Sequence, residues 1–503
     1  VVNVRAIDAV GNVDATPSTR SFTVDTTPPP APSITSPANG TVTNDPSFDV
    51  TGTAGAGNVI DVLDGGSSLG TTTADGSGNW TFPVTSLSDG SHSLTATAAD
   101  PVGNASAASS ARTITVDTHG PAPTVTAPTG NTDGQPTLSG SAGTAARDSS
   151  SVTIDIHSGG SVAGPIAQTL TATVAGNGTW SAKATLLLPI GSYVARVTQT
   201  DSAGNSGSGD GPTFTVQPTI AAAGDIACPP GVARSTSACH YAATSDLLVG
   251  NGYHQVLPLG DNQYNEGTIG QYQNAYDPTW GRVKAISHPV PGNHEYISPS
   301  TTAQGYFDYF DGVGVNDGAA GPRGKGWYSF DIGTWHVIAL NSNCWDATAP
   351  VSCAQGSEQE LWLLSDLAAH TNQCTLAYWH HPRFTSGNAP GISDAAFMDQ
   401  IWKDVVAGGV DLVLNGHAHG YERFAPMTAN GTATSAAAGT REIVAATGGD
   451  DFQSYGSPKA ASEVINNSTF GVLRLTLRSG AYDWQFVPEA GSSFGESGST
   501  NCR

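Results

Sequence analysis

The segment Leu412-Val-Leu-Asn-Gly416-His417-Ala-His419-Gly420 runs from a short apolar stretch directly into a glycine and two histidines. A short apolar run bounded by glycine is typical of a strand buried on both faces of a sheet. The histidines then lie at the carboxyl end of that strand, where α/β domains gather their functional side chains. The segment therefore predicts an α/β domain with a polar site at one edge of its sheet.

Four other apolar runs in residues 219–503 also end in Asp, Asn or His, often behind a glycine. These ends are Gly224-Asp225, Gly260-Asp261-Asn262-Gln263-Tyr264, Pro291-Gly292-Asn293-His294-Glu295 and Trp379-His380-His381-Pro382. One such motif alone is usually a turn, but five in succession are hard to obtain from turns. Oxygen and imidazole donors in this mixture suit Zn, Mn or Fe better than a soft thiolate site.

The rest of this region alternates strands with helical stretches, which favours a layered α/β domain. The expected strands are 220–223, 255–259, 335–340, 376–379, 412–414 and 443–446, with a late β stretch over 470–487. The expected helices are 241–249, 358–369 and 395–406. Ser357 and Glu360 have the spacing of a capping box at the start of the second helix.

The order of the five motifs resembles the calcineurin-like metallophosphoesterases and, within them, the purple acid phosphatases. The resemblance covers about residues 219–425 and ends in Gly416-His-x-His-x-Tyr-Glu-Arg423. It implies a four-layer α/β sandwich that holds two metal ions. The implied ligands are Asp225, His419 and Tyr264 for the first metal, Asn293, His380 and His417 for the second, and Asp261 for both.

The resemblance also implies a reaction. His294 would lie just outside the metals, where it would contact the phosphoryl group or protonate the leaving oxygen. A carboxylate such as Asp261 can span two cations ~3.5–4 Å apart, and such a pair turns a bound water into hydroxide near neutral pH. The expected activity is hydrolysis of phosphomonoesters by attack of that hydroxide.

Two departures from the family pattern matter. Many members have Gly-Asp-x-His at the first motif, whereas the fourth residue here is Ala227. Tyr264 replaces that ligand if it binds as a phenolate, which predicts Fe(III) at the first site and Zn, Mn or Fe(II) at the second. The alternative is that Tyr264 is a packed aromatic side chain and that both metals are divalent.

The second departure concerns substrate contacts. Plant purple enzymes carry a phosphate-binding His pair between the last two motifs, but this chain reads Ser-Gly-Asn-Ala-Pro over 386–390. We therefore expect Asn262, His381 or Arg383 to contact the substrate instead. His380 is taken as the ligand because Pro382 matches the family's His-x-Pro spacing, which leaves His381 beside the substrate or facing solvent.

Other polar residues near the motifs are expected to have supporting roles. Glu295, Glu422 and Arg423 are interpreted as supports, since buried carboxylates commonly orient the imidazoles of metal ligands. Some histidines of this region lie outside the motifs, and we interpret His254, His288, His336 and His370 as structural or exposed.

Residues 1–218 are built differently and contain an internal repeat. The pattern Asp-x-x-Gly-Asn occurs at Asp8, Asp100 and Asp201, and Gly-x-Trp recurs at Trp80 and Trp180. A period near 95 residues with alternating strands is typical of an immunoglobulin-sized β-sandwich. Gly-Asn supplies a tight turn that Asp caps, so we favour a structural role for these Asp residues over binding of sugar or calcium.

These repeats resemble the bacterial immunoglobulin-like domains of secreted surface proteins. We expect a multidomain chain in which all-β sandwich repeats precede the α/β domain. The predicted domains are 1–25, the C-terminal remnant of a repeat; 26–117 and 118–217, two full repeats; and 218–503, the catalytic domain. The chain opens with Val1 and no signal-like segment, so targeting information and attachment to a cell surface are expected in a part that precedes it.

The amino-acid composition limits where the protein can be located and which partners it can bind. The net charge is −23, from 19 Lys+Arg and 42 Asp+Glu, which argues against a nucleic-acid or anionic-membrane partner. No apolar run approaches the ~18 residues of a membrane span. All six cysteines lie in the second region, and we expect the pairs Cys228–Cys239, Cys344–Cys353 and Cys374–Cys502, although six cysteines allow fifteen pairings. Oxidised cysteines indicate a secreted or cell-surface protein.

The leading interpretation is a secreted, dinuclear metal-dependent phosphatase on a β-sandwich stalk. One alternative is a phosphodiesterase or nucleotidase that uses the same site. The other is a surface adhesion protein whose phosphoesterase domain is inactive. The sequence disfavours loss of activity, because every implied metal position except the histidine of the first motif is filled.

Overall fold

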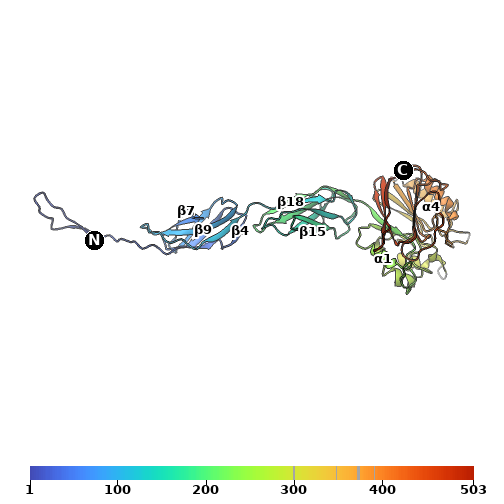
Figure 1. Ribbon diagram of the computed structural model, residues 1–503, viewed down its shortest axis with the longest axis horizontal. Helices are drawn as coiled ribbons and strands as arrows, with labels where there is room; N and C mark the ends of the chain where they lie inside the picture. The colour runs from blue at the N-terminus through green and yellow to red at the C-terminus, as the bar shows by residue number, and fades with distance from the viewer. Residues whose placement is uncertain (298–300, 347, 371–373, 390) are drawn as a thin grey trace.

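The computed structural model shows a row of β-rich units that ends in a larger α/β unit (Figure 1). It describes residues 1–297, 301–346, 348–370, 374–389 and 391–503. At the N-terminus, β1 (Val2–Val4) and β2 (Ser18–Arg20) pair in an exposed antiparallel hairpin. Two sandwiches follow, and the remainder of the chain forms the α/β unit. This arrangement confirms the predicted fold class.

Each sandwich packs two sheets around a small apolar core that encloses one of the repeated tryptophans, Trp80 or Trp180. The first contains β3 (Ser33–Ser36), β4 (Thr41–Thr43), β5 (Phe48–Thr53), β6 (Val59–Asp64), β7 (Ser67–Thr73), β8 (Asn79–Val84), β9 (Gly90–Ala99) and β10 (Arg112–Val116). The second contains β11 (Thr124–Ala127), β12 (Gly130–Thr132), β13 (Thr137–Ser141), β14 (Ser151–Ser158), β15 (Ile166–Thr173), β16 (Thr179–Lys183), β17 (Gly191–Thr200), β18 (Ser206–Asp210) and β19 (Phe214–Val216).

The repeated Asp-x-x-Gly-Asn turns are closed by their own side chains. In the last copy, Asp201 accepts hydrogen bonds from the backbone and the side chain of Asn205 at 2.9 and 2.8 Å. The same amide nitrogen donates to the backbone carbonyl of Asp117, at the end of the preceding sandwich, at 2.8 Å. Asn104 makes the matching contact with Asp25. The turns therefore have the structural role that we favoured, and they also tie successive units together.

The α/β unit contains two sheets packed face to face. One has the order β21 (Gln255–Pro258), β20 (Thr219–Ala223), β29 (Gly471–Arg478), β30 (Ala481–Pro488) and β31 (Ser497–Asn501). The other has the order β22 (Tyr328–Ile332), β23 (Trp335–Ala339), β24 (Cys374–Tyr378), β25 (Leu412–Asn415), β27 (Arg441–Ala445), β26 (Tyr421–Phe424) and β28 (Ser462–Asn466). A core with side chains from both sheets fills the space between them.

Helices cover the outer face of each sheet, which gives the expected four layers. On the first sheet lie α1 (Tyr241–Asp246), α2 (Ile269–Gln271), η1 (Tyr272–Tyr276), η2 (Trp280–Ile286), η3 (His294–Tyr296) and α3 (Gln304–Phe310). On the second lie α4 (Glu358–Ala369), η4 (Ala396–Met398) and α5 (Asp399–Ala407). No helix in the described part of the chain is both long enough and apolar enough to cross a membrane.

Some local predictions were wrong. The helix expected over 241–249 ends at Asp246, and the one expected over 395–406 begins as the short η4. The apolar run before Pro291 makes single bridges at Ser287 and Val290 and is not a strand. The capping box is half formed, because the carboxylate of Glu360 accepts from Gly356 rather than from Ser357.

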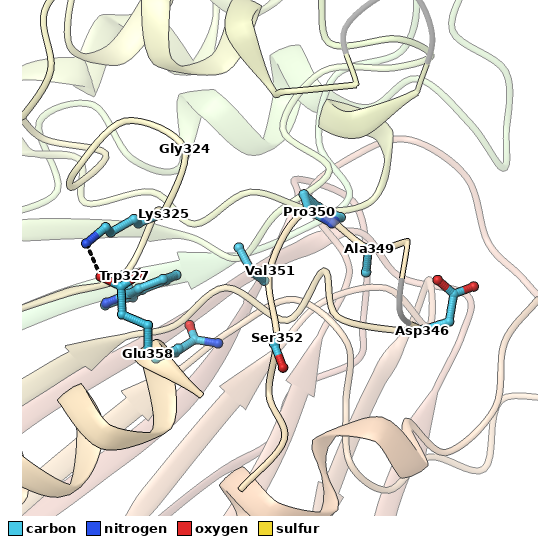
Figure 2. A pocket seen from close by; sticks show the side chains of 10 residues that line it. Gly324, Lys325, Trp327, Asp346, Ala349, Pro350, Val351, Ser352 and Glu358 are labelled. Atoms are coloured by element: carbon cyan, nitrogen blue, oxygen red, sulfur yellow. Dashed lines mark hydrogen bonds and ion pairs between the residues drawn. The ribbon is translucent and has the colours of Figure 1, made fainter. Parts of the chain in front are cut away.

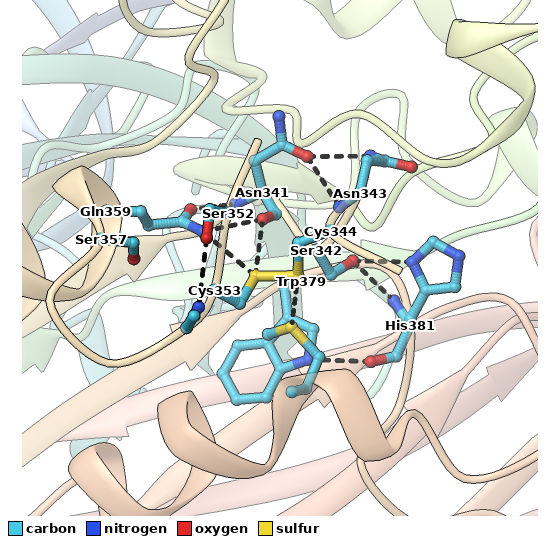
Figure 3. The surroundings of a disulfide bond; sticks show 12 residues. Asn341, Ser342, Asn343, Cys344, Ser352, Cys353, Ser357, Gln359, Trp379 and His381 are labelled. Carbon is cyan, nitrogen blue, oxygen red and sulfur yellow. Dashed lines mark hydrogen bonds between the residues drawn. A yellow bond between two sulfur atoms is a disulfide. The ribbon is translucent and has the colours of Figure 1, made fainter. Parts of the chain in front are cut away.

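Three disulfides join the pairs expected from the sequence: Cys228–Cys239, Cys344–Cys353 and Cys374–Cys502. The last ties the C-terminus to β24, the strand that leads to His380. Figure 3 shows the second pair next to Ser342 and His381. No free cysteine remains among the described residues.

Candidate metal centre

The predicted site residues lie together at the carboxyl ends of strands from both sheets. β20 and β21 run parallel in one sheet, and β24 and β25 run parallel in the other. The loops that follow these four strands, with the loop after Val290, bring Asp, Asn and His side chains to one edge. This edge is where an α/β fold is expected to place its functional groups.

Tyr264 is the centre of one group of donors. Its hydroxyl lies 3.0 Å from Asp225 Oδ1, 3.2 Å from Asp261 Oδ2 and 3.1 Å from His419 Nε2. His419 Nε2 is in turn 3.3 Å from Asp225 Oδ1. Two ligands bound to one ion at about 2.1 Å lie roughly 3.0–3.4 Å apart, so these spacings fit a shared cation.

His380 is the centre of a second group. Its Nε2 lies 3.2 Å from each of Asp261 Oδ2, Asn293 Oδ1 and His417 Nδ1. Its Nδ1 donates to the carbonyl of Leu259 at 2.9 Å, so Nε2 of the neutral ring presents a lone pair. A lone pair that faces two oxygen acceptors needs a proton or a cation between them. The donor set therefore fits a metal ion.

Asp261 belongs to both groups through the same oxygen, Oδ2. Asp225, Asp261 and His380 have donor atoms within 4.8 Å of one another, as do His380, His381 and His417. One carboxylate between two sets of donors is the arrangement that a bridged pair of cations requires. The expected ligands of both metals thus converge in the structure.

Backbone strain is concentrated at these residues. Asp225, Asp261, His417 and His419 have φ values of 61°, 47°, 70° and 43°. Only three other non-glycine residues in the described ranges have positive φ. Such conformations cost ~1–3 kcal/mol each and persist where the surroundings enforce them, most often at functional sites.

Two glycines allow the loops to approach this closely. A Cβ on Gly260 would lie 2.6 Å from the His380 ring, and one on Gly292 would lie 2.2 Å from Asp261 Oδ1. A side chain at either position would displace a predicted ligand.

The electrostatics of the cluster favour bound positive charge. Burial opposes ionisation of His380, but the carboxylate of Asp261 raises the pKa of that imidazole to about 9. Burial, with the carboxylates of Asp225 and Asp261, raises the pKa of the Tyr264 phenol well above its usual value. A phenolate at Tyr264 therefore requires a strongly charged cation beside it.

His294 faces a cavity of about 210 Å³ above the cluster, which Asp261, Asn293, His417 and His419 also line. The Nδ1 of His294 donates to the Asn265 carbonyl at 2.7 Å. Its Nε2 therefore carries a proton only when the ring is cationic.

The three predicted substrate contacts have different surroundings. His381 is buried beside His417, with ring centroids 4.3 Å apart, so it joins the cluster. Arg383 instead forms an ion pair with Asp399 at 3.0 Å and does not join it. Asn262 is fully buried, and its amide donates to the Val290 carbonyl. Pro390, at the end of the 386–390 segment, lies outside the described residues.

The supporting carboxylates act differently from our expectation. Glu295 accepts from the backbone of Asp261, and Glu422 accepts from the backbone and hydroxyl of Ser386, so neither orients an imidazole. Arg423 pairs with Glu463 and Glu496. These contacts agree with supporting roles for the three residues, but the expectation that the carboxylates orient imidazoles was wrong, because the N–H groups of His380 and His419 bond to Leu259 and Asp451 instead.

Two contributors were missed in the sequence. Asp451 accepts from His419 Nδ1, and Ser342 Oγ lies 2.9 Å from His381 Nδ1. Asp451 follows the strand that contains Ile443, so the sequence offered a sixth apolar run that ends in a polar residue. Ser342 follows β23 with no charged residue or glycine beside it, and it gave no comparable signal.

A larger hollow, of about 480 Å³, lies beside Trp327 and holds none of the predicted ligands (Figure 2). There, Lys325 forms an ion pair with Glu358. Residues 349–352, from the loop closed by Cys344–Cys353, form another wall. The predicted ligands Asp261, Asn293, His417 and His419 therefore line the smaller cavity and not this one.

Comparisons with known proteins agree with this architecture. Residues 33–118 and 129–217 match the family model of the bacterial Ig-like domain, and residues 218–421 match that of the calcineurin-like phosphoesterases. Purple acid phosphatase 15 of Arabidopsis thaliana is 30% identical over 162 residues, which are 30% of this chain and 29% of that protein. Purple acid phosphatase 18 of the same plant is 26% identical over 291 residues, which are 54% of this chain and 60% of that protein.

The chain thus spans less than two thirds of the length of these curated relatives. Among solved structures, the purple acid phosphatase PPD1 from yellow lupin (Lupinus luteus) seeds aligns over 94% of this chain and 96% of that one. The identity is 15% and the TM-score is 0.45. The family matches and the curated relatives confirm the resemblance read from the motifs.

Proposed function

Residues 218–421 form a calcineurin-like phosphoesterase domain, and from that premise we propose that the chain hydrolyses phosphomonoesters at a dinuclear metal centre. The observation that carries the proposal is the position of Asp261, whose Oδ2 lies 3.2 Å from both Tyr264 and His380. The proposed ligands are Asp225, Tyr264 and His419 on one side and Asn293, His380 and His417 on the other. Fe(III) is proposed for the first side, and Zn, Mn or Fe(II) for the second.

Two bound cations would supply a water of lowered pKa and offset the charge of the phosphoryl oxygens. Residues of the protein provide the other contributions to binding and proton transfer. Asn293 is a neutral donor, so the centre keeps enough positive charge to attract phosphate. His294 gives the proton on Nε2 to the leaving oxygen, and the Asn265 carbonyl keeps the remaining proton on Nδ1. His381 lies beside His417 and contacts the bound phosphoryl group.

The sandwiches are proposed to be a stalk that carries the phosphatase. The Asn205–Asp117 and Asn104–Asp25 contacts link successive units, and Arg474 pairs with Asp133 at 2.7 Å between the last sandwich and the phosphatase. Three disulfides support an oxidising, extracytoplasmic location. We therefore propose a secreted or surface-attached enzyme.

The test compares hydrolysis of an aryl phosphomonoester with that of the matching diester, after loading with Fe plus Zn or Mn. Faster cleavage of the monoester is expected. Preference for the diester would favour a phosphodiesterase or nucleotidase, and cleavage of neither with metals bound would favour an adhesion protein with an inactive domain.

A matched pair of variants tests the bridging role. Asp261→Asn is expected to reduce metal occupancy from two ions to one and to lower kcat by ~10³-fold or more. Asp246→Asn makes the same change at an exposed carboxylate away from the site, and it is expected to leave both quantities unchanged. Full activity in Asp261→Asn would overturn the mechanism.

A further inference from the structure

The segment that follows β23 is hydrogen-bonded to loops of the proposed metal centre. Asn343 Nδ2 donates to the Pro291 carbonyl at 3.1 Å, directly before the Gly292-Asn293 motif. Ser342 Oγ contacts both Nδ1 and the backbone N–H of His381, at 2.9 and 3.0 Å (Figure 3). These bonds fix the segment to two of the loops that carry predicted ligands.

Covalent and backbone bonds also hold the next turn of this segment. The backbone N–H of Cys344 donates to the Ser342 carbonyl at 2.9 Å. The disulfide between Cys344 and Cys353 closes the loop that follows. The backbone around residue 345 is therefore anchored to the site and to the core of the domain.

Trp345 is the unusual residue of this segment. Its side chain is 41% exposed, whereas Trp280, Trp335, Trp379 and Trp402 are fully buried. Its indole packs edge-on against His381, with ring centroids 6.5 Å apart. His381 in turn lies 4.3 Å from His417, which lines the site cavity. One imidazole therefore separates the exposed indole from a predicted metal ligand.

An exposed aromatic ring on an anchored backbone, one imidazole away from the predicted ligand His417, suits the organic part of a substrate whose phosphoryl group lies at the metals. Burying a tryptophan face against another planar group is favourable, and little side-chain entropy is lost when the backbone is already fixed. An aliphatic alcohol offers no such planar face. The indole thus discriminates between substrates by the shape of the alcohol rather than by the phosphate.

We propose that Trp345 is a specificity residue on which a planar group of the substrate stacks, so that the enzyme prefers phosphomonoesters of aromatic alcohols and of nucleosides over those of aliphatic alcohols. The proposal rests on the phosphomonoesterase activity proposed above. Both substrate types present a planar ring a few bonds away from the phosphate, and the experiment separates them.

The test measures kcat/KM for two matched pairs: phenyl phosphate with cyclohexyl phosphate, and adenosine 5′-monophosphate with ribose 5-phosphate. Trp345→Ala is expected to lower kcat/KM about tenfold for the planar member of at least one pair, mainly through KM. The non-planar members are expected to stay within about twofold. Trp345→Phe keeps a ring and is expected to retain most of the preference.

For each substrate, the kcat/KM of the variant is divided by that of the wild type, which cancels differences in leaving-group chemistry. The pair that responds identifies the source of the planar group. Leu361→Ala removes an exposed apolar side chain from α4 and serves as the control, with no change expected. Equal losses for planar and non-planar substrates, or no loss for either, would overturn the proposal.

A binding measurement separates this proposal from the proposed function. Calorimetry of the metal-loaded full chain with phenylphosphonate and methylphosphonate needs no turnover. Tighter binding of phenylphosphonate that is lost in Trp345→Ala supports the stacking role even if no ester is cleaved. Equal binding of the two phosphonates by the wild type contradicts it, whatever the activity.

Discussion

The carboxylate of Glu295 accepts a hydrogen bond from the backbone N–H of Asp261 at 3.1 Å. It also accepts from the backbone N–H groups of Asn262 and Gln263, at 2.9 and 3.3 Å, and from Gly292 at 2.7 Å. Glu295 is fully buried. It therefore holds the loop of the proposed bridging ligand in its left-handed conformation and connects that loop to the Gly292-Asn293 motif.

Glu295→Gln is expected to weaken metal binding by ~10–100-fold, in the range found when groups that orient metal ligands are changed. The new amide nitrogen would face backbone donors in place of an oxygen, which leaves N–H groups unpaired and frees Asp261 to move. Metal content after dialysis against graded chelator measures the effect. Glu358→Gln, at an exposed carboxylate, is the control, and unchanged metal affinity in Glu295→Gln would contradict the positioning role.

Tyr264→Phe is expected to abolish a visible charge-transfer band while iron remains bound through Asp225, Asp261 and His419. The phenolic oxygen lies 3.0 Å from Asp225 Oδ1, so an ion held by that carboxylate is within its reach. Absorption spectra of the iron-loaded wild type and variant give the measurement. Tyr272→Phe removes a buried hydroxyl that bonds to Glu295, outside the donor cluster, and is expected to keep the band. A colourless, fully active wild type that holds only zinc would rule out the iron–phenolate assignment.

Breaking the Cys374–Cys502 disulfide is expected to destabilise the phosphatase domain more than breaking Cys344–Cys353. The first closes a loop of 128 residues and the second a loop of 9. Loop-closure entropy predicts losses of about 4–5 and about 2–3 kcal/mol for the two double alanine variants. Calorimetric unfolding of the full chain tests which loss is larger, because it records the unfolding transition of this domain in each variant. Equal losses would show that native-state contacts, not chain entropy, determine the effect.

The ends of the apolar runs were predictable because each is a local pattern, an apolar run followed by a ligand, in most cases with a glycine before it. Asp225, Asp261 and His417 were found in this way, and the structure brings them together. Ser342 was not found, because its role depends on a contact with His381, which lies 39 residues further along the chain. The role of Glu295 was misread for a related reason, since the partners of a buried carboxylate are set by how loops pack and not by its neighbours in sequence.

Stability below neutral pH is expected to depend on His288, which lies outside the metal centre. Burial against Phe330, with ring centroids 4.0 Å apart, lowers the pKa of His288 from 6.5 to about 4. Between these values the unfolded chain binds a proton that the folded protein does not. The contribution of neutral His288 to the free energy of unfolding is thus fully present above pH 6.5. It is lost as the pH falls towards 4, and the total loss is about 3 kcal/mol.

His288→Phe keeps an aromatic ring on Phe330 and removes the titration. Chemical unfolding of both proteins at pH 7 and pH 5, at the same metal concentration, gives the comparison. The wild type is expected to lose about 2 kcal/mol more than the variant between these two pH values. Because metal binding also varies with pH, the argument uses only the difference between the proteins, in which that shared contribution cancels. Parallel pH dependence in the two would show that His288 takes up its proton without unfolding, and hence that water reaches the ring in the native state.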